Sequence, residues 1–196
     1  MKTAQRSRPD RHKLSVTLAD RLTRYLVSRL QDGPATVRDL SIALAAADLD
    51  CARSDVATAD RQQYRRRLEH HQLPRLTDVG LVTYPLDGFV RYVPTALDHF
   101  DVRFPSLAEP DHPSWAAVVA VLGRAYRYPL VSAVAEADSI SLFRLANRLA
   151  GPDGTPREFA VALHHVDLPQ LTAVDLLTYD PESRTVANTA ETESVL

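Results

Sequence analysis

The sequence predicts a mainly helical α+β chain in which one small domain occurs twice. The first observation is an internal repeat, because residues 73–84 match residues 168–179 at eight of twelve positions, at an offset of 95. The second is the spacing of the apolar residues, which is helical through most of each copy and ends in two short extended runs. A chain of 196 residues that is 45% hydrophobic can bury one good core or two small ones.

Weaker matches upstream place the beginning of each copy. Arg24-Tyr25 matches Arg127-Tyr128 at an offset of 103, and residues 37–44 match 142–149 at an offset of 105. The second copy is therefore about ten residues shorter, and the loss is expected between its second and third helices. The sequence thus predicts five segments: a basic N-terminal tail (1–14), a first domain (15–95), a linker (96–113), a second domain (114–190) and a C-terminal tail (191–196).

The first copy contains signals for the beginnings of two helices. Thr17-Leu18-Ala19-Asp20 is typical of a capping box, and the helix that follows is expected to stop at Gly33-Pro34. Thr36 and Asp39 offer a second cap, ahead of a second helix.

The third helix is expected to begin at about Ala57, with a kink or a restart at Pro74, because proline lacks the backbone donor. Its inward stripe comprises Tyr64, Leu68, Leu76 and Val79. Gly80 is expected to end it, and residues 81–85 then pair with residues 89–93 as a hairpin.

The second copy repeats this order after an additional helix over 115–122. Thr155-Pro156-Arg157-Glu158 is a cap with proline at the first helical position, and residues 176–179 pair with 185–187 as the hairpin. Asp175 stands where the first copy has Gly80. We expect this aspartate to adopt the left-handed conformation that ends the helix.

Three helices followed by a hairpin, joined by the segment from Leu73-Pro74-Arg75-Leu76 to Gly80-Leu81-Val82-Thr83-Tyr84, resemble the winged helix-turn-helix regulators of archaea and bacteria. More narrowly, this segment and the Arg-Tyr pair of the first helix resemble a haloarchaeal winged-helix domain family of unknown function, present here twice. The resemblance covers about 15–95 and 114–190. It implies tandem winged helix-turn-helix domains, with the hairpin as the wing.

The two halves of the chain differ in charge, although the net charge is only −2. Residues 1–95 carry 16 Lys and Arg against 11 Asp and Glu, whereas residues 96–196 carry 7 against 14. The first half therefore suits a polyanion such as DNA, and the second half would be repelled by one.

The resemblance implies that the third helix of the first copy enters the major groove of double-stranded DNA. Its outward face offers glutamine, arginine and glutamate, which can bond base edges, and further arginines flank it where phosphates would lie. The predicted DNA contacts are Arg61, Gln62, Gln63, Arg65, Arg66, Arg67, Glu69, His70 and, on the wing, Arg91. The alternative, left open, is that the arginine run is an ordinary solvated helix face.

The second copy lacks this charge, because the positions that match the three consecutive arginines are Ala160, Val161 and Ala162. An apolar helix face on an acidic domain suits a protein contact, either with a second chain or with the first domain. The alternative is that alanine and valine merely tolerate exposure. A homodimer is expected, because two half-sites multiply the specificity of a helix-turn-helix protein.

Other classes of site find little support. The single cysteine, Cys51, excludes an internal disulfide, and His70-His71 and His164-His165 point about 100° apart on a helix, so no metal site and no cofactor are expected. No glycine-rich phosphate loop or catalytic triad pattern is present, which predicts a protein that is not an enzyme. No apolar run is long enough for a membrane span, so we expect a cytoplasmic chain.

Together these observations predict a transcription regulator that binds DNA through the first copy and assembles through the second. The alternative is a protein-interaction adaptor that binds no DNA. Salt dependence separates the two, since phosphate contacts weaken steeply as ionic strength rises.

Overall fold

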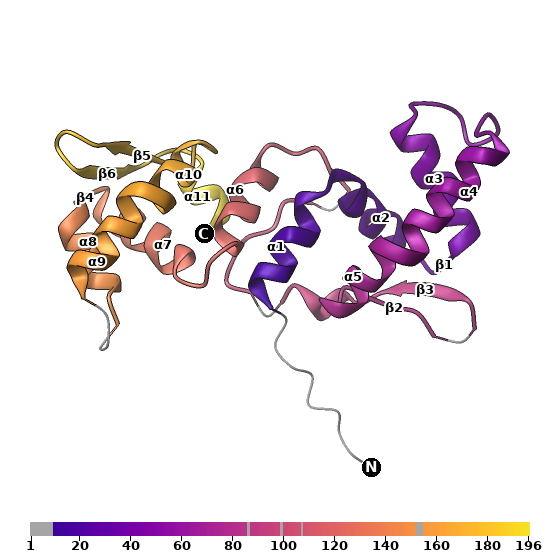
Figure 1. Ribbon diagram of the computed structural model, residues 1–196, viewed down its shortest axis with the longest axis horizontal. Coiled ribbons are helices and arrows are strands. Elements are labelled where there is room, and N and C mark those ends of the chain that lie inside the picture. Colours follow the sequence, from indigo (N-terminus) through magenta and orange to yellow (C-terminus); the bar gives the residue numbers. More distant parts are fainter. Residues whose placement is uncertain (1–9, 86, 99, 107, 152–154) are drawn as a thin grey trace, which may run out of the picture. The chain divides into compact units, whose positions relative to one another are not determined.

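A computed structural model of the chain describes residues 10–85, 87–98, 100–106, 108–151 and 155–196. The chain divides into two compact units, the first drawn from 1–100 and 106–112 and the second from 101–105 and 113–196. Each unit combines helices with a three-stranded antiparallel sheet (Figure 1). The predicted fold class, mainly α with small β-hairpins, is therefore confirmed.

Unit 1 consists of helices followed by a hairpin, with one helix more at its beginning than the sequence predicts. Its elements are α1 (Arg11–Ala19), α2 (Arg21–Gln31), β1 (Ala35–Thr36), α3 (Val37–Asp48), α4 (Thr58–Arg67), the π-helical turn η1 (Leu68–Gln72), α5 (Leu73–Asp78), β2 (Val82–Thr83), β3 (Phe89–Tyr92) and the 3₁₀ turn η2 (Pro94–Ala96).

The first helix begins elsewhere than the sequence predicts. Thr17 does not start a capping box; it lies inside α1 and is buried, and its hydroxyl donates to the carbonyl of Lys13 at 2.7 Å. The cap belongs to Asp20, whose extended backbone separates α1 from α2 and whose carboxylate accepts from the Leu22 N–H at 3.0 Å. The capping-box prediction was therefore wrong by three residues. Helix α1 also occupies residues 11–14, which the sequence assigned to a tail, and residues 1–9 lie outside the described part of the chain.

The cap of the second predicted helix is confirmed. Thr36 precedes α3 and accepts from the backbone N–H of Asp39 at 3.1 Å, while the Thr36 hydroxyl donates to the Asp39 carboxylate at 2.8 Å. This cap fixes the position at which the chain turns from β1 into α3.

The restart predicted at Pro74 takes the form of the π-helical turn η1. Pro74 lies in the first turn of α5 and has no N–H to donate to the carbonyl four residues earlier, so the chain accommodates an extra residue before it. The Leu73 N–H donates to the Leu68 carbonyl, five residues back. The four residues predicted as the inward stripe of this helix, Tyr64, Leu68, Leu76 and Val79, are all buried.

The predicted hairpin follows Gly80, which has a φ of +74°. Strands β2 and β3 pair antiparallel, with Val82 opposite Tyr92, which confirms the predicted hairpin of unit 1. We call this hairpin the wing. Strand β1 pairs with the other edge of β3 and gives the sheet order β1-β3-β2. The sequence did not predict β1, because two residues are too short to show a period.

Unit 2 repeats this order from α7 onward, and its sheet order, β4-β6-β5, corresponds to that of unit 1. Its elements are α6 (Ser114–Leu122), α7 (Arg127–Ala137), β4 (Ser139–Ser141), α8 (Leu142–Leu149), α9 (Pro156–Ala162), the π-helical turn η3 (Leu163–Asp167), α10 (Leu168–Thr172), β5 (Leu177–Asp180), β6 (Thr185–Asn188) and α11 (Thr192–Val195).

The differences between the copies lie at the positions that the sequence predicts, with one exception. Asp175 has a φ of 55°, so this aspartate does replace Gly80 at the end of the helix. Helices α8 and α9 have 8 and 7 residues, whereas α3 and α4 have 12 and 10, which accounts for much of the shorter second copy. Thr155 is the N-cap residue of α9, but its side chain makes no capping hydrogen bond.

The predicted C-terminal tail contains α11 instead, which packs against α6 and α7. The Thr192 hydroxyl donates to the carbonyl of Leu176 at 2.7 Å, and Val195 is fully buried. The predicted linker is likewise ordered where it is described, since residues 101–105 belong to unit 2 and residues 106–112 to unit 1. Short terminal and connecting segments have no sequence pattern that shows whether their apolar residues are buried.

Candidate nucleic-acid interface

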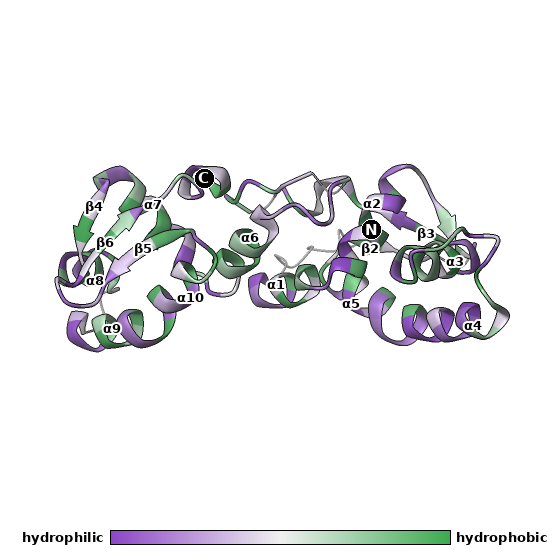
Figure 2. Ribbon diagram, turned by 90° about the horizontal axis from the view of Figure 1, so that it is seen from above, coloured by the Kyte–Doolittle hydropathy of each residue, from purple (hydrophilic) through white to green (hydrophobic). Residues whose placement is uncertain are grey.

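Two buried side chains hold the third helix of unit 1 against its core. Tyr64 is 7% exposed and donates a hydrogen bond to the carboxylate of Asp48 at the end of α3, and Leu68 is fully buried. Tyr64 is the only buried side chain of α4, and Leu68 is the first residue of η1, directly after it. The ribbon of α4 is coloured mainly as hydrophilic (Figure 2), and most of its residues are exposed and available to a partner.

The structure exposes a majority of the residues that the sequence predicted on this face. Those exposed are Gln62, Gln63, Arg65, Arg66, Arg67 and His70, whereas Arg61 and Glu69 are half-buried. Among the described residues Arg66 has no ion-pair partner. The prediction therefore agrees with the observed exposure for most of the face.

Two of the predicted contacts already have partners within the unit. The Arg61 side chain donates from Nε to the carbonyl of Val56 at 2.8 Å, which ties it to the loop before α4. Arg65 forms an ion pair with Glu69 one turn away, at 2.9 Å between Nε and Oε1. An exposed pair of this kind contributes little to stability, about 0.3–0.5 kcal/mol, so a phosphate or a base can replace Glu69 at low cost.

Arg67 points toward a different neighbourhood from Arg65. Its guanidinium lies 3.7 Å from the carboxylate of Asp20 and 3.9 Å from that of Asp48. Both distances are longer than a hydrogen bond, so the attraction is electrostatic only. Arg67 therefore lies beside the α1–α2 junction, on the flank of the exposed face.

The wing of unit 1 carries a second positive group. Arg91 on β3 forms an ion pair with Asp87 in the turn, with 2.5 Å between Nη2 and Oδ2, and this bond lowers the pKa of the Asp87 carboxyl. The guanidinium carbon of Arg91 lies 5.9 Å from the ring centre of Phe89, which is 40% exposed. The wing thus presents an aromatic side chain and an arginine together.

Next to the exposed face of α4 lies an open groove of about 460 Å³, which we call the cationic groove. Its lining residues come from the α1–α2 junction, the end of α4, η1 and α5: Asp20, Arg66, Arg67, His70, His71, Gln72 and Arg75. All of them are exposed or half-exposed except Gln72, which is buried. The sequence singled out three of these residues but not the groove.

The corresponding helix of unit 2 has a different surface. Of the three positions predicted as a protein contact, Val161 is 55% exposed, whereas Ala160 and Ala162 are half-buried. Phe143 on α8 is 63% exposed and shares a groove of about 390 Å³ with Val161. We call this groove, with its flanking Arg157 and Arg184, the apolar groove.

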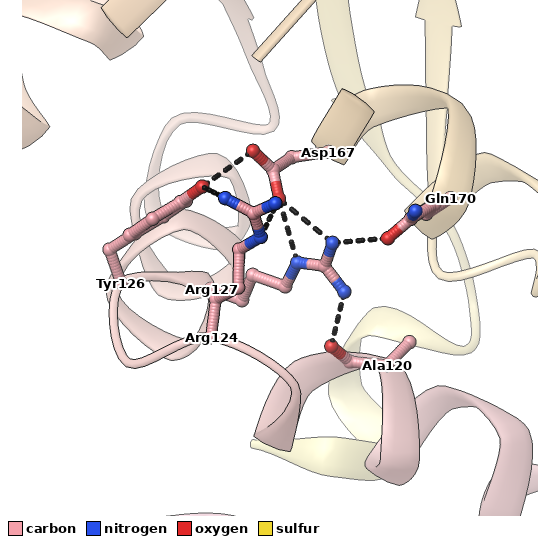
Figure 3. Close-up of polar contacts among 6 residues, drawn as sticks. All are labelled: Ala120, Arg124, Tyr126, Arg127, Asp167 and Gln170. Atoms are coloured by element: carbon pink, nitrogen blue, oxygen red, sulfur yellow. Dashed lines mark hydrogen bonds and ion pairs between the residues drawn. The ribbon is translucent and has the colours of Figure 1, made fainter. Parts of the chain in front are cut away.

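Unit 2 contains a buried ion pair that sequence reasoning missed. Asp167, which is fully buried, accepts from Nε of Arg127 at 2.8 Å and from the Tyr126 hydroxyl at 2.6 Å (Figure 3). Arg127 is 5% exposed and also donates to the Ala120 carbonyl at 2.8 Å and to the amide oxygen of Gln170. Burial raises the pKa of Tyr126, and its hydrogen bond to Asp167 adds to the shift.

One feature of the internal repeat could have indicated the Arg127–Asp167 ion pair. Asp167 lies 95 residues after Gln72, directly before the repeated Leu-Pro, so the two copies place a carboxylate and an amide at the same point. Both residues are buried. Sequence alone does not reveal that burial, because each residue is polar and is flanked by residues of mixed character.

The Tyr64 hydroxyl makes unit 1 sensitive to alkali. Burial raises the pKa of Tyr64 to about 12, and the hydrogen bond to Asp48 acts in the same direction. Since the ordinary value is 10.0, the stability that neutral Tyr64 contributes is complete below pH 10 and is lost as the pH rises toward 12. We expect Tyr64→Phe to lower the free energy of unfolding by about 1–3 kcal/mol near pH 7 and to reduce the further loss above pH 10.

The measurement is urea unfolding, followed by far-ultraviolet circular dichroism, of both proteins across this pH range. Other tyrosines with raised pKa, such as Tyr126 and Tyr179, are present in both proteins, so the difference between them isolates Tyr64. Parallel pH profiles would contradict the assignment.

Within the described ranges, no cluster of three or more His, Cys, Asp and Glu side chains has an arrangement suited to a metal ion. Of the helices that the structure describes, none combines the length and the apolar character needed to cross a bilayer. The candidate interface of unit 1 comprises the arginine, glutamine and histidine side chains of α4 and η1, together with the wing.

These features define a class: an α+β domain with a small antiparallel sheet and a polar, exposed helix α4. In a comparison with protein families, residues 16–91 match a family described as Domain of unknown function (DUF7344). The match begins in α1 and ends in β3, so it lies within unit 1. Searches of curated proteins and of solved structures found no match.

Proposed function

We propose that this chain is a DNA-binding transcription regulator, in which unit 1 reads double-stranded DNA through α4 and the β2–β3 wing. The observation that carries the proposal is the surface of α4, where Gln62, Arg65 and Arg66 are exposed on a helix whose only buried side chain is Tyr64. The excess of basic over acidic residues in the first half of the chain supports the same function.

The chemistry of this face suits duplex DNA. Glutamine can bond the edge of adenine at two points, and arginine can do the same with guanine. Arg91 on the wing lies beside the aromatic Phe89, and in this proposal the wing meets the sugar-phosphate backbone. The Arg65–Glu69 ion pair is exposed, so its rupture on binding costs little.

The test compares the wild type with Arg65→Ala/Arg66→Ala on a pool of genomic duplex fragments across a salt series. We expect the variant to lose selective retention, since each base contact is worth about 1–3 kcal/mol, or roughly tenfold or more in affinity. The matched control is Arg144→Ala/Arg148→Ala in unit 2, which removes the same charge from exposed positions and is expected to bind as the wild type does. If the wild type retains no DNA, or all three proteins behave alike, the result contradicts DNA reading by α4 and favours the adaptor alternative.

Unit 2 serves assembly in this proposal, and the occupant of its apolar groove is a second copy of the chain. Phe143 and Val161 are large exposed apolar side chains that share this groove. Arg157 and Arg184 flank them, while the second half of the chain carries 14 acidic against 7 basic residues. Charge complementarity therefore favours an acidic unit 2 of another copy as the partner.

We expect the wild type to sediment as a dimer and Phe143→Ser/Val161→Ser to sediment as a monomer. Val16→Ser in α1 is the control, because Val16 is 50% exposed and lies outside the apolar groove. Analytical ultracentrifugation over a range of concentrations measures the dissociation constant. A monomeric wild type, or a variant that still dimerises, would contradict the proposed role of unit 2 in assembly.

A further inference from the structure

Gln72, one of the residues that line the cationic groove, has a buried polar side chain. It is 4% exposed, and among the described residues neither its Nε2 nor its Oε1 has a hydrogen-bond partner. An unsatisfied buried amide costs about 1–3 kcal/mol, and folded proteins rarely leave one in place. Gln72 is also one of the residues that line the groove, and a turn of its side chain toward the opening would bring the amide within reach of a bound molecule.

The charges around Gln72 show which kind of molecule fits. Arg66, Arg67 and Arg75 are exposed around the groove, and they face a single lining carboxylate, that of Asp20. Asp20 is already engaged as the N-cap of α2, where it accepts from Leu22 and Thr23. The groove therefore has an excess of positive charge and an amide that can donate from Nε2.

Unit 2 fills the same position with its own carboxylate. Asp167 takes the place of Gln72 in the repeat and accepts from Arg127 and Tyr126, with Arg124 at 3.5 Å. In unit 1 the arginine that matches Arg127 is Arg24, which donates to the carbonyls of Leu18 and Ala19 at 2.6 and 3.0 Å. At this position unit 2 therefore has a buried carboxylate, whereas unit 1 has an amide beside an open groove lined by arginines.

We propose that the cationic groove binds a phosphate group of a small molecule, with Arg66, Arg67 and Arg75 meeting its charge and Gln72, once its side chain turns toward the opening, donating from Nε2 to a phosphate oxygen. Arginine suits this role because its guanidinium matches the geometry of phosphate oxygens. The volume of about 460 Å³ lies in the range of ligand sites and holds more than one phosphate. The inference goes beyond DNA reading, because its ligand is small and free.

The probe is inorganic pyrophosphate, titrated into the full chain by calorimetry at constant ionic strength. We expect saturable binding at one site per chain. Arg75→Ala is expected to weaken it at least tenfold, and Gln72→Asp, which introduces the carboxylate of unit 2, is expected to abolish it. Arg53→Ala is the control, because Arg53 is exposed in unit 1 and does not line the groove.

Arg75 is exposed, so its variant keeps the fold even if Gln72→Asp does not, and circular dichroism checks both.

Arg65→Ala separates this site from the DNA interface, because Arg65 does not line the groove. Pyrophosphate binding that survives Arg65→Ala and is lost in Arg75→Ala, with DNA binding retained in Arg75→Ala, supports a free phosphate compound as the ligand. If Arg75→Ala weakens DNA and pyrophosphate alike, the phosphate site stands, and its phosphate comes from the DNA backbone. The absence of saturable binding to the wild type, or unchanged binding to Arg75→Ala, overturns the proposal.

Discussion

Replacing Asp167 by alanine is expected to lower the free energy of unfolding of unit 2 by about 3–5 kcal/mol. The substitution leaves the buried guanidinium of Arg127, only 5% exposed, without its counter-charge and leaves the Tyr126 hydroxyl without its acceptor. An unpaired buried charge is among the most destabilising changes that a single substitution can make.

The protein contains its own probe for this experiment. Trp115 is the single tryptophan of the chain, lies on α6 of unit 2 and is 2% exposed. Its fluorescence during urea unfolding therefore follows unit 2, and the midpoint is expected to fall sharply in Asp167→Ala.

A double variant tests whether the unpaired charge is the cause. Asp167→Leu/Arg127→Leu removes both charges, and we expect it to recover much of the lost stability, since a buried ion pair can often be replaced by apolar residues at little cost. An unchanged fluorescence midpoint in Asp167→Ala would contradict the prediction. A double variant as unstable as the single one would assign the loss to packing.

Leu68→Ala is expected to destabilise unit 1 by about 2–5 kcal/mol. Leu68 is fully buried at the junction of α4 and η1, where it and Tyr64 hold the proposed recognition helix against the core. The change removes apolar contact and leaves a cavity. We expect the variant to lose affinity for DNA as well, because the exposed face of α4 is no longer held in one orientation.

The repeat provides the matched control for this variant. Leu163 stands at the corresponding position of unit 2 and is also fully buried. We expect Leu68→Ala to leave the fluorescence transition of Trp115 in place while it shifts the far-ultraviolet signal, and Leu163→Ala to move the fluorescence transition. If both variants move the tryptophan signal equally, the units unfold together and the assignment of Leu68 to an independent core is wrong.

The sequence predicted the parts of the fold that depend on local chemistry. Gly80 and Asp175 were identified as the residues that end the third helices, because few residues adopt a positive φ without strain. The two hairpins followed from the extended runs behind them. Thr36 was identified as a cap from its spacing to Asp39, and the structure shows both hydrogen bonds.

Features that depend on tertiary context were not predicted. The break between α1 and α2 at Asp20 was missed, because the apolar period continues across it and Thr17 offers an equally good local pattern. Strand β1 consists of two residues that become a strand only because β3 lies beside them.

For the candidate site, exposure was easier to predict than partners. The arginine run on α4 was correctly placed on the surface, yet its sequence did not show that Arg65 pairs with Glu69 or that Arg67 lies near Asp20. The cationic groove was missed because it combines Asp20 with a segment about fifty residues further along the chain, residues 66–75, which includes the buried Gln72. Burial of a polar residue is set by the packing of those segments rather than by its neighbours in the sequence.

The π-helical turn has a geometric consequence for the third helix. An α-helix advances about 100° per residue, so one extra residue in a turn shifts the phase of everything that follows it. The spacing of the buried leucines shows this shift, because Leu68 and Leu73 are five residues apart and Leu73 and Leu76 are three apart. The extra residue brings Gln72 to the inner side along with Leu73, and the same slip brings Asp167 inward beside Leu168 in the second unit. One added residue, repeated in both halves of the chain, thus sets the two polar groups inside otherwise apolar cores.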